Sequence, residues 1–230
     1  MLIPGRENRY LKKLAVILIL MAGASSVMSE EVVRENTGKG FYIGGGAGSS
    51  RYLITLSESR YDYSDPDNPS FTFEASELED SDSGNLLYAG YQFNKIIAVE
   101  AAYTEYGNFS KIIFAKQYSQ APESLAVYAN AGYTFLNGQL RPFGIGGLGY
   151  LNRNQSRAYD RLGFKGEFVT LHLGFGIDYY PTVLRGLGFR LSFSDDMYVE
   201  SDYTYTGSTT ETDSLWQNYS LFYAGVQYKF

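Results

Sequence analysis

The stretch FVTLHLGFGIDYY, residues 168–180, alternates large apolar side chains with small or polar ones. A period of two places successive side chains on opposite faces of a β-strand. One face of this segment carries Val169, Leu171, Leu173, Phe175, Ile177 and Tyr179, and the other carries Thr170, His172, Gly174, Gly176 and Asp178. The segment therefore predicts a strand with one apolar face and one small or polar face.

Seven further segments show the same alternation, most clearly at 187–193 and 220–230 and less cleanly at 40–54, 85–93, 96–105, 125–136 and 140–151. Long connections, at 55–84, 106–124, 152–167 and 195–217, alternate with short turns. In an up-and-down meander this alternation brings all long loops to one end. The sequence predicts an all-β fold, an eight-stranded antiparallel up-and-down transmembrane β-barrel with four long external loops.

The composition excludes several classes of function. The 230 residues contain no Cys, which removes disulfide scaffolds, thiolate metal sites and a Cys nucleophile, and a net charge of −6 argues against a nucleic-acid partner. Tyrosine is abundant, at 22 residues, and favours positions where one end of the side chain is apolar and the other is wet. We expect interfacial girdles formed by Tyr42, Tyr88, Tyr103, Tyr133, Tyr150, Tyr179, Tyr180 and Tyr228.

The first 29 residues have the pattern of a secretory signal peptide. Four basic residues precede the apolar run LAVILILMAG (14–23), and small residues follow it. We expect cleavage after Ala24, Ser26 or Ser29, with an uncleaved anchor as the alternative. Residues 30–39 form a short polar lead-in, and 40–230 form the barrel.

The apolar strand faces fit two kinds of barrel. A membrane barrel turns them outward, whereas a soluble lipocalin-like barrel turns them inward. Charged residues opposite the apolar rows, dense glycine in GGGAG (44–48) and GIGGLG (144–149), and the export signal favour the membrane barrel. The soluble barrel remains the alternative.

Several segments resemble the small eight-stranded outer membrane proteins of Gram-negative bacteria, the group with the outer membrane protein A transmembrane domain and the opacity-type porins. They are AGYQFN (89–94), AVEAAYTEYG (98–107), GYTF (132–135), GIGGLGY (144–150), GFGIDYY (174–180), LGFRLSF (187–193) and VQYKF (226–230). The resemblance implies export through the periplasm to the outer membrane, with both chain ends periplasmic. The terminal strand resembles the signal read by the barrel assembly machinery, through Phe222, Ala224, Val226, Tyr228 and Phe230.

Five charged or titratable side chains are expected to face the lumen: Glu100, Arg190, Asp178, His172 and Lys229. Each needs a partner in an interior of low dielectric constant, so we expect a paired polar plug. The resemblance suggests an alternative, in which the Glu100–Arg190 pair gates a narrow pore. His172 is the single histidine, and we predict no catalytic, cofactor or metal site.

The predicted loops carry most of the remaining charge. Nine acidic residues lie between 55 and 83, where DPDNP (65–69) offers oxygen ligands for Ca²⁺. Basic residues of the third loop, Arg153, Arg157, Arg161 and Lys165, are candidates for contact with lipopolysaccharide phosphates or for salt bridges to the acidic loops.

We therefore expect an integral outer-membrane barrel with a structural and surface-interaction role in adhesion, host contact or envelope integrity. Its expected partners are outer-membrane lipids, lipopolysaccharide, the assembly machinery, and a host or surface ligand at the loops. A narrow pore is the main alternative, because glycine-rich strands leave space in the lumen. A lipid-modifying enzyme is a weaker alternative, given the lone histidine.

Overall fold

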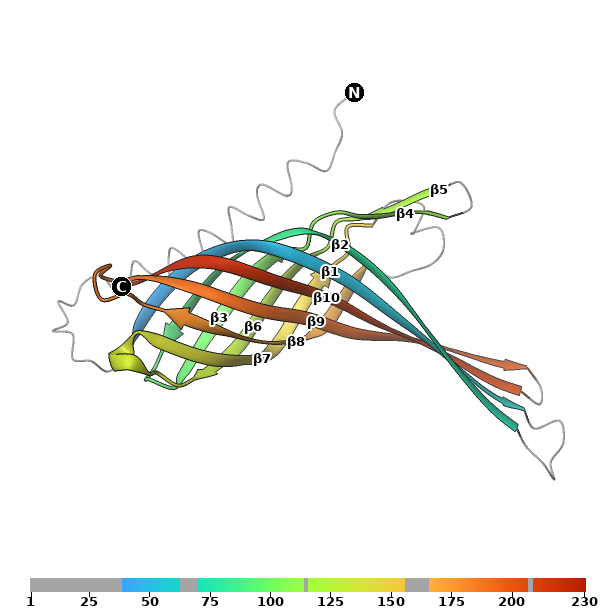
Figure 1. Cartoon of the computed structure of the whole chain (residues 1–230). Coiled ribbons are helices and arrows are strands. Elements are labelled where there is room, and N and C mark those ends of the chain that lie inside the picture. Colours follow the sequence, from blue (N-terminus) through green and yellow to red (C-terminus); the bar gives the residue numbers. More distant parts are fainter. Residues whose placement is uncertain (1–38, 63–69, 114–115, 156–165, 207–208) are drawn as a thin grey trace.

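The computed structural model describes residues 39–62, 70–113, 116–155, 166–206 and 209–230, and nearly all of them lie in strands (Figure 1). The strands are β1 (Gly40–Asp62), β2 (Ser70–Gln92), β3 (Ile97–Glu105), β4 (Phe109–Ile113), β5 (Lys116–Gln120), β6 (Glu123–Gly132), β7 (Leu140–Asn152), β8 (Glu167–Tyr179), β9 (Leu187–Thr206) and β10 (Thr209–Lys229). A single 3₁₀ turn, η1 (Leu136–Gly138), connects β6 to β7. Within the described ranges, no helix is long and apolar enough to cross a membrane.

Eight of the strands close into one barrel, in the order β1-β10-β9-β8-β7-β6-β3-β2. Every neighbouring pair is antiparallel, and β1 closes the ring by pairing with both β2 and β10. The predicted eight-stranded up-and-down barrel is therefore confirmed. We call the end with the β2–β3, β6–β7 and β8–β9 connections the turn end. The chain's C-terminus lies at this end (Figure 1).

The two faces of β8 show whether the apolar side chains of the barrel point outward or into the lumen. Its apolar row points outward, with Val169 71% and Phe175 64% exposed, whereas His172 and Asp178 on the other face are 2% and 1% exposed. A soluble barrel would bury the apolar row instead. The outward apolar band and polar interior are those of a transmembrane barrel, so the lipocalin-like alternative is excluded.

Three of the predicted loops are instead largely β-hairpins. β1 and β2 pair without interruption out to Asp62↔Ser70, and β9 and β10 pair out to Thr206↔Thr209. Segment 106–124 contains the separate hairpin β4–β5. These segments are rich in Ser, Thr and Tyr, of which Thr and Tyr favour strands. These segments show no apolar row in the sequence, because residues of both parities along them are largely polar. Most of the fourth predicted loop, 152–167, lies outside the described residues.

Four strands continue beyond the rest of the barrel. β3 leaves β2 after Asn85↔Glu105, and β8 leaves β9 after Leu171↔Met197. Beyond these points β2, β1, β10 and β9 remain paired in that order, and they extend well past the other strands (Figure 1). We call the outer part of this extension, residues 53–62, 70–79, 199–206 and 209–216, the projecting sheet.

Candidate functional site

The lumen is organised around Arg190 of β9. Asp178 of β8 lies directly opposite Arg190 in the ladder, and Glu100 reaches it from β3. The guanidinium Nε donates to Asp178 Oδ1 at 2.7 Å and Nη1 donates to Glu100 Oε2 at 2.9 Å. Nη2 donates to both carboxylates at 3.1 Å. One guanidinium is thus held in bidentate geometry by two buried carboxylates, the strongest form of such pairing.

Glu100 collects further donors besides Arg190. The Tyr42 hydroxyl donates to Oε1 at 2.5 Å and the Tyr128 hydroxyl donates to Oε2 at 3.0 Å. Asn130 Nδ2 donates to Oε1 at 2.5 Å. Glu100 is 1% exposed, so these bonds replace the water that an ionised carboxylate would otherwise need.

Aromatic rings and a second arginine complete this arginine layer. The Arg190 guanidinium carbon lies 4.3 Å from the centre of the Tyr88 ring and 4.6 Å from that of Phe143. On the turn side, Arg141 Nη1 lies 3.6 Å from Asp178 Oδ2. Two guanidinium groups therefore balance the two carboxylates of Glu100 and Asp178, and the layer is neutral as a whole.

A second layer surrounds His172. Its Nδ1 lies 2.9 Å from Asp196 Oδ1, and Thr170 Oγ1 donates to the same oxygen at 2.8 Å. The Tyr106 hydroxyl donates to Asp196 Oδ2 at 2.6 Å. The Tyr128 ring stacks on the imidazole with centres 4.8 Å apart, and its hydroxyl bonds Glu100, so Tyr128 joins the two layers.

Two buried charged residues of the lumen, Asp196 and Arg141, are not among the five predicted from the sequence. Asp196 is fully buried, although it falls in segment 195–217, for which the sequence predicts a loop. The signal was present, because Arg190, Ser192, Ser194 and Asp196 continue one period-two face into the lumen.

A third layer, farther from the turn end, consists mainly of tyrosines. Tyr52 and Tyr198 both donate to Gln217 Oε1, at 2.7 and 2.8 Å. Tyr219 stacks on Tyr52 with ring centres 4.5 Å apart. The tyrosines are therefore divided between two roles. Tyr42 and Tyr88, expected in the girdles, fill the lumen, whereas Tyr103, Tyr133, Tyr150, Tyr179 and Tyr228 lie on the outward face.

Arg153 also belongs to the third layer, where it forms the alternative contact expected for it, a salt bridge to an acidic residue of segment 195–217, and not the contact with lipopolysaccharide. It is 3% exposed, its guanidinium carbon lies 4.7 Å from the centre of the Phe168 ring, and Nη2 lies 3.7 Å from Glu200 Oε2. An inward-facing arginine packed in this way cannot reach a lipid headgroup. The other three basic candidates, Arg157, Arg161 and Lys165, lie outside the described residues.

The glycines expected to leave space in the lumen are closely packed against neighbouring residues instead. A Cβ added at Gly44 would lie 2.5 Å from the Tyr88 ring. At Gly147, between Tyr128 and His172 in the ladder, a Cβ would lie 2.5 Å from the Cα of Tyr128. The space freed by these glycines is therefore occupied.

The remaining sequence candidates lie at the turn end or outside the described residues. Lys229 donates from Nζ to Gln92 Oε1 at 2.8 Å, at the mouth of the lumen. The alternating residues of the proposed assembly signal all face outward on β10: Phe222, Ala224, Val226, Tyr228 and Phe230. The calcium candidate at 65–69 falls in an undescribed segment, and the described part of the chain contains no group of three acidic or histidine side chains that could hold a metal.

Comparisons with known proteins agree with this architecture. The chain matches the model of the outer membrane protein beta-barrel domain over residues 14–230. It is similar to OprG from Pseudomonas aeruginosa, with 14% identity, coverage of 86% of this chain and 99% of that chain, and a TM-score of 0.46. It is also similar to Neisserial surface protein A, with 17% identity, coverage of 80% of this chain and 99% of that chain, and a TM-score of 0.37. For Ail of Yersinia pestis the identity is 14%, the coverage is 77% of this chain and 98% of that chain, and the TM-score is 0.35. A comparison with curated proteins finds no significant match. Because the family model spans almost the whole chain, this protein belongs to the outer membrane protein beta-barrel domain family of Gram-negative outer membranes.

Proposed function

We propose that this protein is a closed outer-membrane scaffold that presents the projecting sheet at the cell surface for contact with a host or surface ligand. Barrels of this kind place short turns in the periplasm and long connections outside. The turn end then faces the periplasm, after export by the signal peptide and insertion through the terminal-strand signal. The projecting sheet lies on the outer side.

The observation that carries the proposal is the unbroken pairing of the projecting sheet. Among the described strands, nothing pairs with the outer edge of β2 over 70–79 or with that of β9 over 199–206. Open edges present backbone N–H and C=O groups that bind an added strand. A sheet held away from the membrane with two open edges is suited to binding an extended segment of another protein.

The filled lumen supports a scaffold rather than a conduit or an enzyme. The arginine, histidine and tyrosine layers are buried and lie one above another along the axis. His172 is 2% exposed and bonded to Asp196, so the proposal assigns it a packing role and no catalytic step.

Shortening the two long hairpins tests the display function. The cuts are made at the facing pairs Leu53↔Glu79 and Val199↔Trp216, and each pair is joined by an Asn-Gly turn. Cells with the shortened protein should lose attachment to host-cell monolayers, while the protein keeps the heat-dependent gel migration of a folded barrel. Removal of β4–β5 is the matched control for loss of a hairpin. Undiminished attachment after shortening would refute the proposal.

Single-channel recording tests the pore alternative. The refolded protein should be silent in a planar bilayer, because the arginine layer blocks the lumen. If the Glu100–Arg190 pair is instead a gate, Glu100→Ala with Arg190 intact should raise the conductance of a folded barrel. Regular openings of the wild-type protein would favour the pore.

A further inference from the structure

Large apolar side chains are exposed in the three short connections at the turn end of the barrel. These turns comprise residues 93–96, 133–139 and 180–186, all of which the structure describes. They follow one another around the ring, because β3 pairs with β6 and β7 pairs with β8. Their exposed apolar side chains include Phe93, Ile96, Phe135, Leu136, Val183 and Leu184, and Val183 reaches 84%. A contiguous group of exposed apolar side chains marks a surface that contacts a partner or a membrane.

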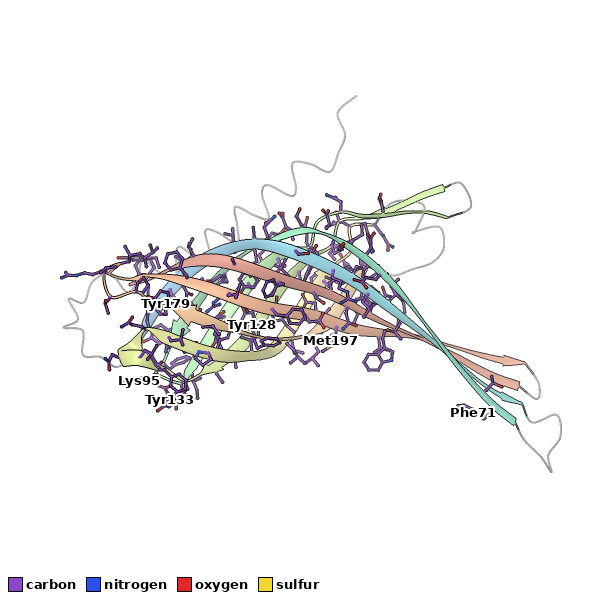
Figure 2. The ribbon with its side chains drawn as sticks, in the orientation of Figure 1. Phe71, Lys95, Tyr128, Tyr133, Tyr179 and Met197 are labelled. Atoms are coloured by element: carbon purple, nitrogen blue, oxygen red, sulfur yellow. The ribbon has the colours of Figure 1, made fainter. Side chains whose placement is uncertain are left out.

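The outward apolar band of the barrel continues into these turns. Tyr133 and Tyr179 are exposed at the turn end (Figure 2). Phe135 follows on from Tyr133, and their rings pack edge to face with centres 4.8 Å apart. Phe93 packs on Tyr91 in the same way, at 5.0 Å. Exposed tyrosines beside apolar rings are typical of the level where acyl chains give way to lipid headgroups, so the turns lie at that level.

The charged residues of the three turns are all basic. Lys95, which marks this end in Figure 2, and Arg185 are exposed, and the sequences of the turns contain no Asp or Glu. This sign is opposite to that of the whole chain, which has a net charge of −6. Exposed apolar groups beside basic ones form a surface that binds anionic lipid, because the apolar groups enter the headgroup layer while the cations attract lipid phosphates.

We propose that the three turns bind anionic phospholipid in the membrane leaflet at the turn end. Leu136, Val183 and Leu184 enter the headgroup layer, and Lys95 and Arg185 contact the lipid phosphate groups. A lipid surface suits the geometry better than one small ligand does, because the exposed side chains are spread over three turns around the ring. The proposal is independent of surface display, since the turns lie at the opposite end from the projecting sheet (Figure 1).

Fluorescence quenching tests the proposal, because Trp216 is the single tryptophan and can be moved. In the mature protein, Trp216→Phe combined with Val183→Trp places the probe in the third turn. The variant is refolded into vesicles of phosphatidylcholine and phosphatidylglycerol, in which one lipid at a time is brominated. Quenching should show a preference for phosphatidylglycerol of about fivefold, the effect of one cation near an anionic surface. Adding Arg185→Gln, in the same turn, should remove most of this preference.

Phe222→Trp in the Trp216→Phe background is the matched control. Phe222 is 54% exposed in the apolar band of β10, away from the turns, and its probe should be quenched equally by both lipids. Leu184→Trp is a second probe if the Val183 variant lacks the heat-dependent gel migration of a folded barrel. If turn and control probes show the same lipid preference, the turns do not select anionic lipid. If the turn probes are not quenched, the turns do not contact lipid, and either result overturns the proposal.

Discussion

The lumen and the projecting sheet are built from the same strands but are held together differently. Arg190 and Asp196 of β9 lie in the barrel and are bonded through their side chains, whereas the backbone of residues 201–206 of the same strand pairs with a neighbouring strand on one side only. Burial demands a partner for each polar side chain in the lumen, and water removes that demand outside. The free energy of unfolding therefore depends mainly on the barrel. Side chains of the projecting sheet can be substituted at little cost in stability, which leaves them available for contact with a ligand.

The largest effect is expected from the centre of the lumen. Arg190→Met should destabilise the barrel by about 3–5 kcal/mol, because it leaves Glu100 and Asp178 buried without their shared counter-ion. The measurement is the urea midpoint of unfolding in detergent or lipid vesicles, followed by heat-dependent gel migration. Shortening the projecting sheet should leave this midpoint unchanged.

A triple variant provides the control for charge. Arg190→Met combined with Glu100→Gln and Asp178→Asn removes the charge of all three groups and should recover much of the lost stability. If the single and triple variants unfold at the same urea concentration, packing of the arginine side chain matters and its charge does not. If Arg190→Met alone is as stable as the wild-type protein, the claim that side-chain bonds in the lumen stabilise the barrel is wrong.

The lumen could largely be placed from the sequence because burial enforces alternation. Glu100, Asp178, His172 and Arg190 all lie opposite apolar rows, and the structure places each of them inside. The partners could not be predicted in the same way. Arg190 meets Glu100 across the barrel, a contact that depends on register and curvature and not on spacing along the chain.

The strands of the projecting sheet could not be predicted from the sequence, because no burial enforces an alternation there. In water both faces of a strand can be polar, so the Ser- and Thr-rich segments after residue 55 and after residue 198 show no apolar row. Arg153 shows the same limit: it was assigned to a solvated loop, but it folds back over Phe168 into the lumen. Local alternation therefore identifies membrane-spanning strands well and identifies their polar extensions poorly.

A smaller effect is expected where ring packing, without charge, fills the lumen. Gly44→Ala should destabilise the barrel by about 1–3 kcal/mol, because the new Cβ would lie 2.5 Å from the buried ring of Tyr88. Gly146→Ala is the control on the outward face of β7, where the nearest atom, of Leu173, would be 3.6 Å away. Both variants are compared by urea midpoint. Equal losses would show that strand backbone, and not the filled lumen, sets the cost.

The smallest effect is expected at the base of the projecting sheet, where a side chain does make a bond. Asp82 of β2 accepts the backbone N–H of Asn108 at 2.6 Å and that of Ser83 at 2.7 Å. These two donors lower the pKa of the Asp82 carboxyl below its usual 3.8, the Asn108 bond most strongly. Through Asn108, Asp82 ties β2 to the segment that leads into β4.

A lowered pKa means that the bond stabilises this junction fully above the usual value and is lost as pH falls through the lowered one. The Asn108 amide proton should therefore shift in the NMR spectrum with a midpoint below pH 3.8. In Asp82→Asn this titration should vanish, while the urea midpoint of the barrel stays the same because Asp82 is half-buried and its carboxylate accepts from Ser83 and Asn108, outside the three lumen layers. If the amide still titrates in the variant, another group controls the junction. If the urea midpoint of the barrel falls in Asp82→Asn, the projecting sheet contributes to the stability of the barrel. The two regions are then less independent than their contacts indicate.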